Sequence, residues 1–491
     1  MKVTELEANA LTYQALRKPD FQRGTANWPP EKIADFIRSF LDGDLIPSII
    51  LWRSPDSGNI FVIDGAHRLG ALIAWVHDDF GDGNVSQAFF EHNIAPEQIS
   101  AAKKTRAIVK KSIGSYLDIQ YAGKNPDKSK QEMVKRARNL GSFAVQLQWV
   151  HGDAGKAETS FFKINQEAVP IDPTELRILK ARKKPNALAA RAILRAGAGH
   201  KYWSEFSEVN QHEIEKLAKE IHAMLFAPPL ETPIKTLDLP IAGRGYSGQS
   251  LPLIFDFVNL ATEIGHGEAA QESLADDTDG SKTIDYLKVV RRITWRICGN
   301  HASSLGLHPA VYFYSSTGRH QPTAFLAVVS LMKDFEKRDF FRTFTKHRGI
   351  FEHFLVAHKT FVNQTVIKFG STLKGYPRLG QMYGLIVSHL TNGKAVEQIV
   401  TELQNDANFN YLKATEDNSA KAVGTKFSSE TKSATFLREA FQGALTCKIC
   451  DGFIHLNALT IDHKQRVREG GTSVAENAQV THPYCNTTYK Q

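Results

Sequence analysis

Apolar residues recur every three or four positions along several stretches of the chain, which is the spacing of a helix that buries one face. The first such helix is expected to begin after Trp28-Pro29-Pro30 and to end at Gly43. Its apolar face is formed by Ile33, Phe36, Ile37 and Phe40. Two apolar runs follow at 46–52 and 60–63, with the turn-forming Ser57-Gly58-Asn59 between them. They predict a hairpin of two strands, so this part of the chain is expected to be a mixed α/β domain.

Helical spacing prevails from residue 186 to residue 415. An alanine-rich run at 187–196 ends at Gly197, and a later amphipathic run stops at Pro228-Pro229, so we expect a mainly helical middle region. Aromatic, basic and amide residues gather at 308–321. Such residues form either a packed core or a surface that stacks on nucleic-acid bases, and the packed core is the more ordinary of the two.

Composition sets the broad class of the protein. A chain of 491 residues is too long for one core, so two to four domains are expected. The sequence contains four cysteines, no leader-like apolar segment and no apolar run long enough to span a bilayer, which favours a cytoplasmic protein without disulfides. The net charge of +8 is compatible with a phosphate-bearing partner but does not demonstrate one.

Three of the four cysteines lie in the last fifty residues, together with a histidine. Cys447 and Cys450 are three positions apart, and His482 and Cys485 repeat that spacing further along. Two tight turns that each present two soft ligands are what a tetrahedral zinc site needs. The sequence therefore predicts a structural zinc site.

A second group of polar residues falls between and beside these ligands. Asp462 and His463 follow a short apolar run that predicts a strand, Asn477 lies further along, and Asn486 follows the last zinc ligand. Carboxylate and carboxamide oxygens suit Mg²⁺, and a neighbouring imidazole suits a general base.

This order of residues over 434–491 resembles the HNH family of endonucleases, which have a ββα-metal fold. The resemblance implies that His463 deprotonates the attacking water, that Asp462 and Asn486 hold a catalytic Mg²⁺ or Mn²⁺, and that Asn477 pins the loop orienting His463. Two positions depart from the commonest pattern, because His482 replaces a zinc cysteine and Asn486 replaces the final histidine. Gly470-Gly471 supplies the expected tight reversal. The alternative is a zinc ribbon that only staples a small domain.

Near the N-terminus, an Asp-Gly turn joins the second predicted strand to an apolar helix. Asp64, Gly65, His67 and Arg68 lie at this junction. Free backbone N–H groups and an arginine at a helix start make an anion site. The alternative is that Asp64 caps the helix and pairs with Arg68 on the surface.

Further residues extend this pattern into a second resemblance. Gln22-Arg23, Trp28, the Asp-Gly-x-His-Arg motif and a later Phe-x-x-Ile-Asn segment at 161–165 resemble the ParB/sulfiredoxin-like domain of GmrSD-type restriction enzymes. The resemblance covers roughly 15–185 and implies that Asp64, Gly65, His67, Arg68, Gln22 and Arg23 bind a nucleotide or phosphate. Ala66 stands where that family usually has glutamine, so one polar contact to the nucleotide is missing. The resemblance therefore implies binding of a nucleotide or phosphate and leaves hydrolysis open. A fold-holding role for Asp64 and Arg68, without any nucleotide, stays open.

A strongly basic tract separates the two parts of this second resemblance, with eleven lysines and arginines between Lys103 and Arg138. A solvated helix face is the default interpretation of such charge, and a track for the DNA backbone is the alternative.

These patterns together predict a multidomain α+β protein. We expect a ParB/sulfiredoxin-like sensor domain at 1–185, a helical DNA-binding or coupling region at 186–415, a polar linker, and an HNH endonuclease domain at 434–491. The implied function is metal-dependent hydrolysis of double-stranded DNA for restriction or phage defence, gated by a module that senses a nucleotide or modified phage DNA. A homodimer is one way to cut both strands. The alternative is a DNA-binding adaptor whose zinc site is purely structural.

Overall fold

The computed structural model describes residues 1–17, 28–55, 58–90, 94, 96–153, 156–157, 159–160, 163–164, 177–178, 180–199, 201–245, 247, 249–265, 270, 273–414 and 426–490. The chain forms two compact units. The first comprises Met1–Arg182 with two short later segments, and the second comprises Lys183–Gly197, Trp203–Gly245 and Gln249–Gln491.

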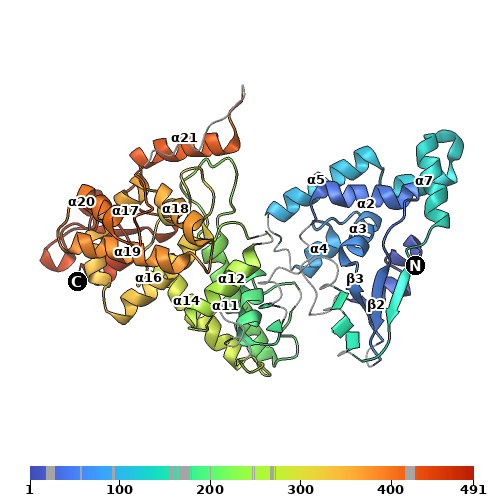
Figure 1. Cartoon of the computed structure of the whole chain (residues 1–491), viewed down its shortest axis with the longest axis horizontal. Coiled ribbons are helices and arrows are strands. Elements are labelled where there is room, and N and C mark those ends of the chain that lie inside the picture. The colour runs from blue at the N-terminus through green and yellow to red at the C-terminus, as the bar shows by residue number, and fades with distance from the viewer. Residues whose placement is uncertain are drawn as a thin grey trace. The chain divides into compact units, whose positions relative to one another are not determined.

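The first unit combines a small sheet with short helices (Figure 1). Its strands are β1 (Leu16–Arg17), β2 (Ile49–Arg53), β3 (Ile60–Asp64) and β4 (Leu147–Val150). Its helices are η1 (Val3–Leu6), α1 (Leu11–Ala15), α2 (Pro30–Asp42), α3 (Ala66–His77), α4 (Asn84–Phe89), α5 (Pro96–Ser112), α6 (Tyr116–Lys124), η3 (Pro126–Lys128) and α7 (Gln131–Ser142).

The sheet has the order β1-β3-β2-β4, in which β2 and β3 are antiparallel and the two outer pairs are parallel. Alternate side chains point to opposite faces. Ile49 and Leu51 belong to the main core with α2 and α3, while Trp52 and Ile63 pack with Ala157 in a smaller cluster. The predicted hairpin and the mixed α/β character are confirmed. The likeness of this unit to the ParB/sulfiredoxin fold stays a prediction.

Helix α2 follows the expected boundaries closely. Pro30 occupies its first position, and Gly43 ends it with a φ of +87°. A left-handed residue at this place lets the last turn close its hydrogen bonds, and glycine adopts that conformation without strain.

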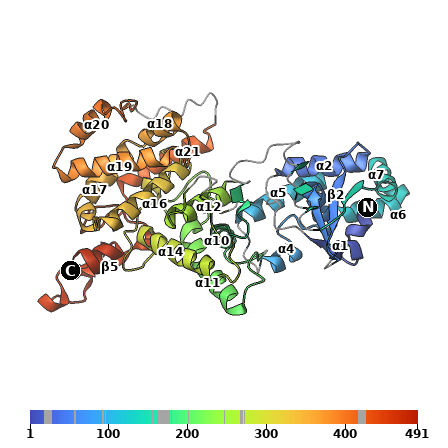
Figure 2. The same cartoon turned by 60° about the horizontal axis from the view of Figure 1, so that its bottom comes forward.

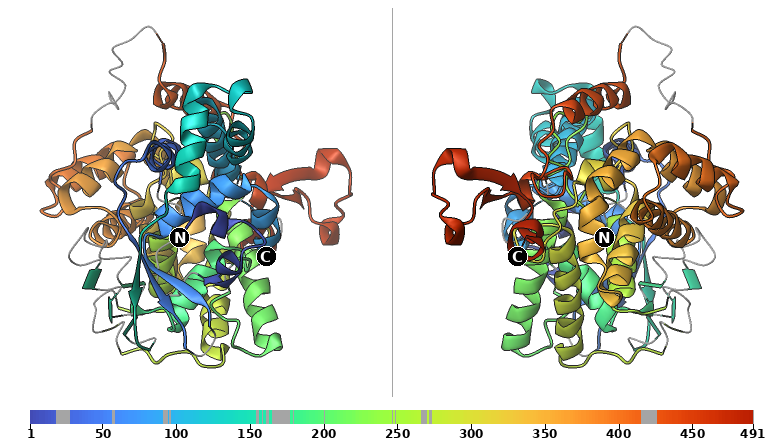
Figure 3. Two further views of the ribbon diagram at one scale, coloured as in Figure 1. Left: turned by 90° about the vertical axis from the view of Figure 1, so that its right-hand side faces the viewer. Right: turned by 90° about the vertical axis from the view of Figure 1, so that its left-hand side faces the viewer.

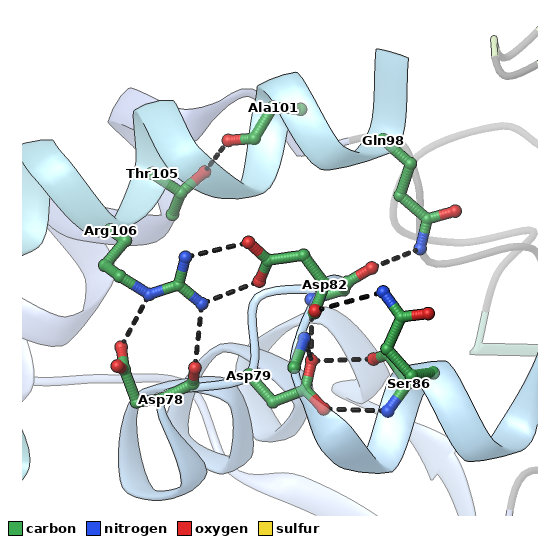
Figure 4. Close-up of polar contacts among 11 residues, drawn as sticks. Asp78, Asp79, Asp82, Ser86, Gln98, Ala101, Thr105 and Arg106 are labelled. Atoms are coloured by element: carbon green, nitrogen blue, oxygen red, sulfur yellow. Dashed lines mark hydrogen bonds and ion pairs between the residues drawn. The ribbon is translucent and has the colours of Figure 1, made fainter. Parts of the chain in front are cut away.

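Arg106, one of the residues of the basic tract, forms hydrogen bonds within the first unit (Figure 4). Arg106 on α5 donates to Asp82 at 2.6 and 2.8 Å, and to the carboxylate and carbonyl of Asp78 at 2.9 and 2.8 Å. Asp79 accepts hydrogen bonds from the backbone of Gly81, Gly83 and Ser86, and Ser86 lies in the first turn of α4. Arg106 therefore joins α5 to the loop between α3 and α4, and is not a simple solvated cation.

The second unit is mainly helical (Figure 2). Its long helices are α10 (Pro185–Leu194), α11 (Glu208–Phe226), α12 (Ser250–Ala261), α14 (Ser281–Ile297), α16 (Pro322–Lys337), α17 (Phe341–Ala357), α18 (Thr360–Phe369), α19 (Tyr376–Thr391), α20 (Val396–Asn405) and α21 (Ser429–Gln442). Its shorter elements are α15 (Pro309–Tyr312), η4 (Leu456–Ala458), β5 (Thr460–His463), η5 (Val467–Glu469), η6 (Ala475–Asn477), β6 (Ala478–Thr481) and η7 (Cys485–Tyr489).

The aromatic segment around α15 is part of the core of this unit. His308, Tyr312, Phe313 and Tyr314 are all buried. They pack against other aromatic rings, including Phe325, and are closed to a nucleic-acid base. The packed-core interpretation of 308–314 is therefore correct.

Strands β5 and β6 form an antiparallel hairpin near the end of the chain, with Asp462 opposite Gln479 and His463 opposite Ala478. Figure 3 shows this hairpin projecting from the helical body of the second unit. Among the helices that the structure describes, none has the length and apolar character needed to cross a membrane.

Candidate active site and metal centre

The four predicted zinc ligands converge on one point. The ligand atoms of Cys447, Cys450, His482 and Cys485 all lie within 4.8 Å of one another, and all four residues are buried. Nδ1 of His482 is 3.4 Å from the Cys450 sulfur and 4.0 Å from the Cys485 sulfur. A zinc tetrahedron with bonds of about 2.0–2.3 Å separates its ligands by roughly 3.5–3.8 Å. The donor set and its geometry thus fit a metal ion such as zinc.

The tautomer of His482 also favours metal binding. Nε2 of His482 is 3.0 Å from the Phe453 carbonyl, which can only accept, so Nδ1 keeps its lone pair toward the sulfurs. Burial lowers the pKa of His482, which keeps the ring neutral. Hydrogen bonds among the three thiols lower the pKa of Cys447 and raise the pKa values of Cys450 and Cys485, so the three sulfurs are close enough to share protons, and the thiolate is the form that binds metals.

Backbone bonds connect this metal centre to the hairpin and to the helical body. The Lys448 N–H donates to the Val480 carbonyl on β6 at 3.1 Å. On the other side, the Gly349 N–H of α17 donates to the Cys450 carbonyl at 3.1 Å, and the Tyr484 N–H donates to the Ser304 carbonyl at 2.9 Å. The zinc segment is therefore packed against the helices of its unit and is not suspended on a tether.

The predicted catalytic residues lie on the hairpin and on the turn after it. Asp462 and His463 end β5, and Asn477 immediately precedes β6. Nε2 of His463 is 3.3 Å from the Ser473 hydroxyl. Asn486 lies in η7, and its side-chain amide donates to the Ile461 carbonyl at 3.3 Å, beside Asp462. Asn486 is thus held against the strand that carries Asp462 and His463.

Asn477 holds the loop that follows His463. Its side-chain oxygen accepts from the Gln465 N–H at 2.8 Å, and its amide donates to the carbonyls of Gln465 and Thr472 at 3.0 and 2.8 Å. Gly470, with a φ of +84°, lies at the reversal of this loop. The side chain of Asn477 therefore closes the loop between β5 and β6.

Both oxygens of the Asp462 carboxylate accept hydrogen bonds from nitrogen donors. Oδ1 accepts from the His463 N–H at 2.8 Å. Oδ2 accepts from the Lys490 ammonium at 2.6 Å and from the Gln479 amide at 3.2 Å. An ammonium group on this oxygen marks a place where a cation is stabilised.

Two of these partners were missed by the sequence analysis. Gln479 lies opposite Asp462 in the hairpin register, so correct pairing of β5 with β6 identifies it. Lys490 carries no such signal, because its position depends on η7, a π-helical turn that returns the chain to β5.

At the N-terminal motif, the arginine faces inward. Arg68 donates to Asp64 at 2.6 Å and to the Ser48 carbonyl at 3.1 Å, while its Nε is buried and finds no hydrogen-bond acceptor among the described residues. Gly65 precedes α3 with a φ of +89°. The ring of His67 stacks on Trp28 with centroids 5.4 Å apart. Asp64 pairs with Arg68 without capping the helix. Gln22 and Arg23 lie outside the described residues.

Comparison with known families assigns both ends of the chain. Residues 6–182 match the family described as GmrSD restriction endonuclease, N-terminal domain, and residues 447–491 match the family described as HNH endonuclease. No curated protein and no solved structure matches the chain. The two family matches identify an HNH-type endonuclease, an enzyme that hydrolyses phosphodiester bonds of DNA, fused to an N-terminal domain of the GmrSD restriction-endonuclease type.

Proposed function

We propose that this protein is a metal-dependent DNA endonuclease of restriction or phage defence, which cleaves with the hairpin site and is controlled by its N-terminal module. The arrangement that supports this most strongly is a hairpin joined to a Cys₃His cluster, in which Asp462 and His463 end β5 and the Asn486 amide is bonded to the Ile461 carbonyl on the same strand. A zinc ribbon that only staples a domain has no need of these three groups on one strand and the adjoining turn.

Each residue of the hairpin has a separate role in the proposed reaction. His463, at the end of β5, takes the proton of the attacking water. Asn477 keeps the 464–472 loop closed, so that the imidazole stays aimed at the scissile phosphate.

Asp462 and Asn486 are the groups that would hold a catalytic Mg²⁺ or Mn²⁺. The Asn486 amide nitrogen faces the Ile461 carbonyl, which leaves its oxygen as the ligand atom. The Asp462 carboxylate already pairs with an ammonium group, which fits a site for a cation. When bound, such an ion polarises the phosphate and stabilises the leaving oxygen.

Plasmid cleavage tests this proposal. The zinc-loaded full chain should nick or linearise supercoiled DNA with Mg²⁺ or Mn²⁺, and His463→Ala should lose at least about a hundredfold in rate. His212→Ala, an exposed histidine on α11, is the matched control. If unmodified and modified phage DNAs both survive the wild-type protein, the adaptor alternative is the better description.

The N-terminal module is proposed to be a ParB/sulfiredoxin-like sensor of a nucleotide or of modified DNA. An arginine whose buried Nε finds no acceptor in the described part of the chain, together with a glycine at a helix start, favours an anion there. Calorimetry with ATP, GTP and CTP on the wild type and on Arg68→Ala tests this role. Absence of heat from the wild type would leave Asp64 and Arg68 as groups that hold the fold.

A homodimer is proposed if both strands are cut, because one HNH site cleaves one strand at a time. The order in which nicked and linear plasmid appear distinguishes a dimer from a monomer. A dimer should give linear plasmid without accumulation of the nicked form, and a monomer should pass through it. Light scattering at the same protein concentration supplies the mass.

A further inference from the structure

The contact between Lys490 and Asp462 has a role that the family resemblance does not assign. Lys490 follows η7, and its side chain folds back onto β5. Its ammonium is 2.6 Å from Asp462 Oδ2 and also contacts the His463 carbonyl. The two side chains are only 19% and 11% exposed. At this depth a charge pair is screened less than on the surface.

The backbone of Lys490 is also held in place. Arg466, in the loop after β5, donates to the Lys490 carbonyl. The chain end and the hairpin are thus joined at two points, one through the ammonium and one through the carbonyl. A lysine fixed at both ends is a built part of the site, unlike a surface lysine that meets a carboxylate by chance.

The hydrogen bonds of Asp462 leave little space for a metal ion beside Lys490. An ionised carboxylate has about four lone-pair directions. His463 N–H, Lys490 and Gln479 occupy three of them, and Lys490 contributes the only full charge among these three donors. A divalent cation on this carboxylate therefore either displaces the ammonium or is repelled by it at close range.

We propose that Lys490 competes with the catalytic cation for Asp462 and thereby couples metal loading to the arrival of DNA. This inference rests on the proposed function of Asp462 as a metal ligand. A DNA phosphate brings negative charge that attracts the divalent cation and offers the ammonium a new partner. Without DNA, Lys490 keeps Asp462 neutralised and the site weakly loaded. Lys490 is thus a positioning residue with a defined exchange of partners.

Metal binding, measured without turnover, tests the proposal. The zinc-saturated full chain is titrated with Mn²⁺ while the free-ion signal is followed by electron paramagnetic resonance. Lys490→Met should bind Mn²⁺ about tenfold more tightly than the wild type, because a unit charge a few ångströms from the ion is removed. Lys490→Arg should resemble the wild type. Lys464→Met is the matched control, since its ammonium contacts the Glu476 carbonyl at 2.7 Å and carries the same charge in the same hairpin.

Two further measurements of Mn²⁺ affinity distinguish a failure of the competition from a failure of the proposed metal site. In a His463→Ala background, which prevents cleavage, a DNA duplex should raise the Mn²⁺ affinity of the chain with Lys490 much more than that of the chain with Lys490→Met. Asp462→Asn should abolish the site in every background. Equal or weaker Mn²⁺ binding by Lys490→Met, with the site still lost in Asp462→Asn, overturns the competition alone. Absence of any Mn²⁺ site sensitive to Asp462→Asn overturns the proposed metal site, and the competition with it.

Discussion

Arg348 and Glu352, one turn apart on α17, form an ion pair in which neither side chain is exposed to solvent, with Nε 2.7 Å from Oε1. The other oxygen of Glu352 accepts the Phe453 N–H at 2.6 Å, shortly after Cys447 and Cys450 of the metal centre. Arg348 also donates to the carbonyls of Leu305 and Gly306. One buried pair on a helix therefore fixes the backbone of the metal centre.

Replacement of Glu352 by Gln should destabilise the second unit strongly. The change leaves the Arg348 charge buried without its counter-ion, and such losses are about 3–5 kcal/mol. Denaturant unfolding measures the loss, and a chromogenic zinc chelator measures whether the metal leaves faster. Arg338→Gln, just after α16, is the control, because its pair with Asp334 is about half exposed and should contribute at most about 1 kcal/mol.

A double variant separates charge burial from packing. Arg348→Met with Glu352→Leu should be less destabilised than Glu352→Gln alone, because no unpaired charge remains. If the double variant is the worse of the two, shape and hydrogen bonding at α17 dominate over charge.

Removal of zinc should loosen more than the C-terminal segment. The Cys450 and Phe453 backbones are bonded to α17, so losing the metal should expose amides on α17 as well as on β5 and β6. Hydrogen exchange before and after treatment with a strong chelator measures this. Unchanged protection of 341–357 would mean that the helices hold their packing without the metal centre.

Local spacing was sufficient to predict the elements whose partners are near in sequence. Helix α2 and the β2–β3 hairpin follow from residues within a few positions of each other. The ligand pairs of the metal centre are also visible in sequence, because each pair is presented by one turn. The contact of Glu352 with Phe453 spans 101 positions, and no local pattern marks a glutamate that is buried by the fold.

In the candidate site, too, some contacts could be predicted from the sequence and others could not. Asn477 was assigned to the loop from its motif, and its three hydrogen bonds are there. The sequence left open whether Arg68 holds an anion or pairs with Asp64 on the surface; the pair is present, but Arg68 turns inward and Asp64 does not cap the helix. Lys490 was missed because its neighbours depend on how η7 turns.

Replacement of Asn477 by Ala should slow cleavage while zinc stays bound. Three hydrogen bonds to the loop after His463 are lost, and displacement of a catalytic group by about 1 Å can cost roughly a hundredfold in rate. Single-turnover cleavage and zinc content are measured on the same preparation. Glu476→Ala, the exposed neighbouring residue, should keep its rate. Wild-type rates in Asn477→Ala would show that the loop closes without this side chain.

His308 should make the second unit sensitive to acid. Burial lowers the pKa of His308 well below its ordinary value of 6.5, and the positive charges of His455, Lys359 and Arg348 lower it further. The unfolded chain therefore binds a proton below about pH 6.5 that the folded chain does not bind. The free energy of unfolding then falls as the pH drops, by up to about 1.4 kcal/mol per pH unit for this residue.

His308→Phe, which fits beside Phe441 and Phe453, should flatten this pH dependence of the free energy of unfolding, measured with urea on zinc-saturated protein at pH 7.5 and 5.5. The exposed His212→Phe should leave it unchanged, and equal slopes for His308→Phe and the wild type would assign the acid sensitivity to other groups.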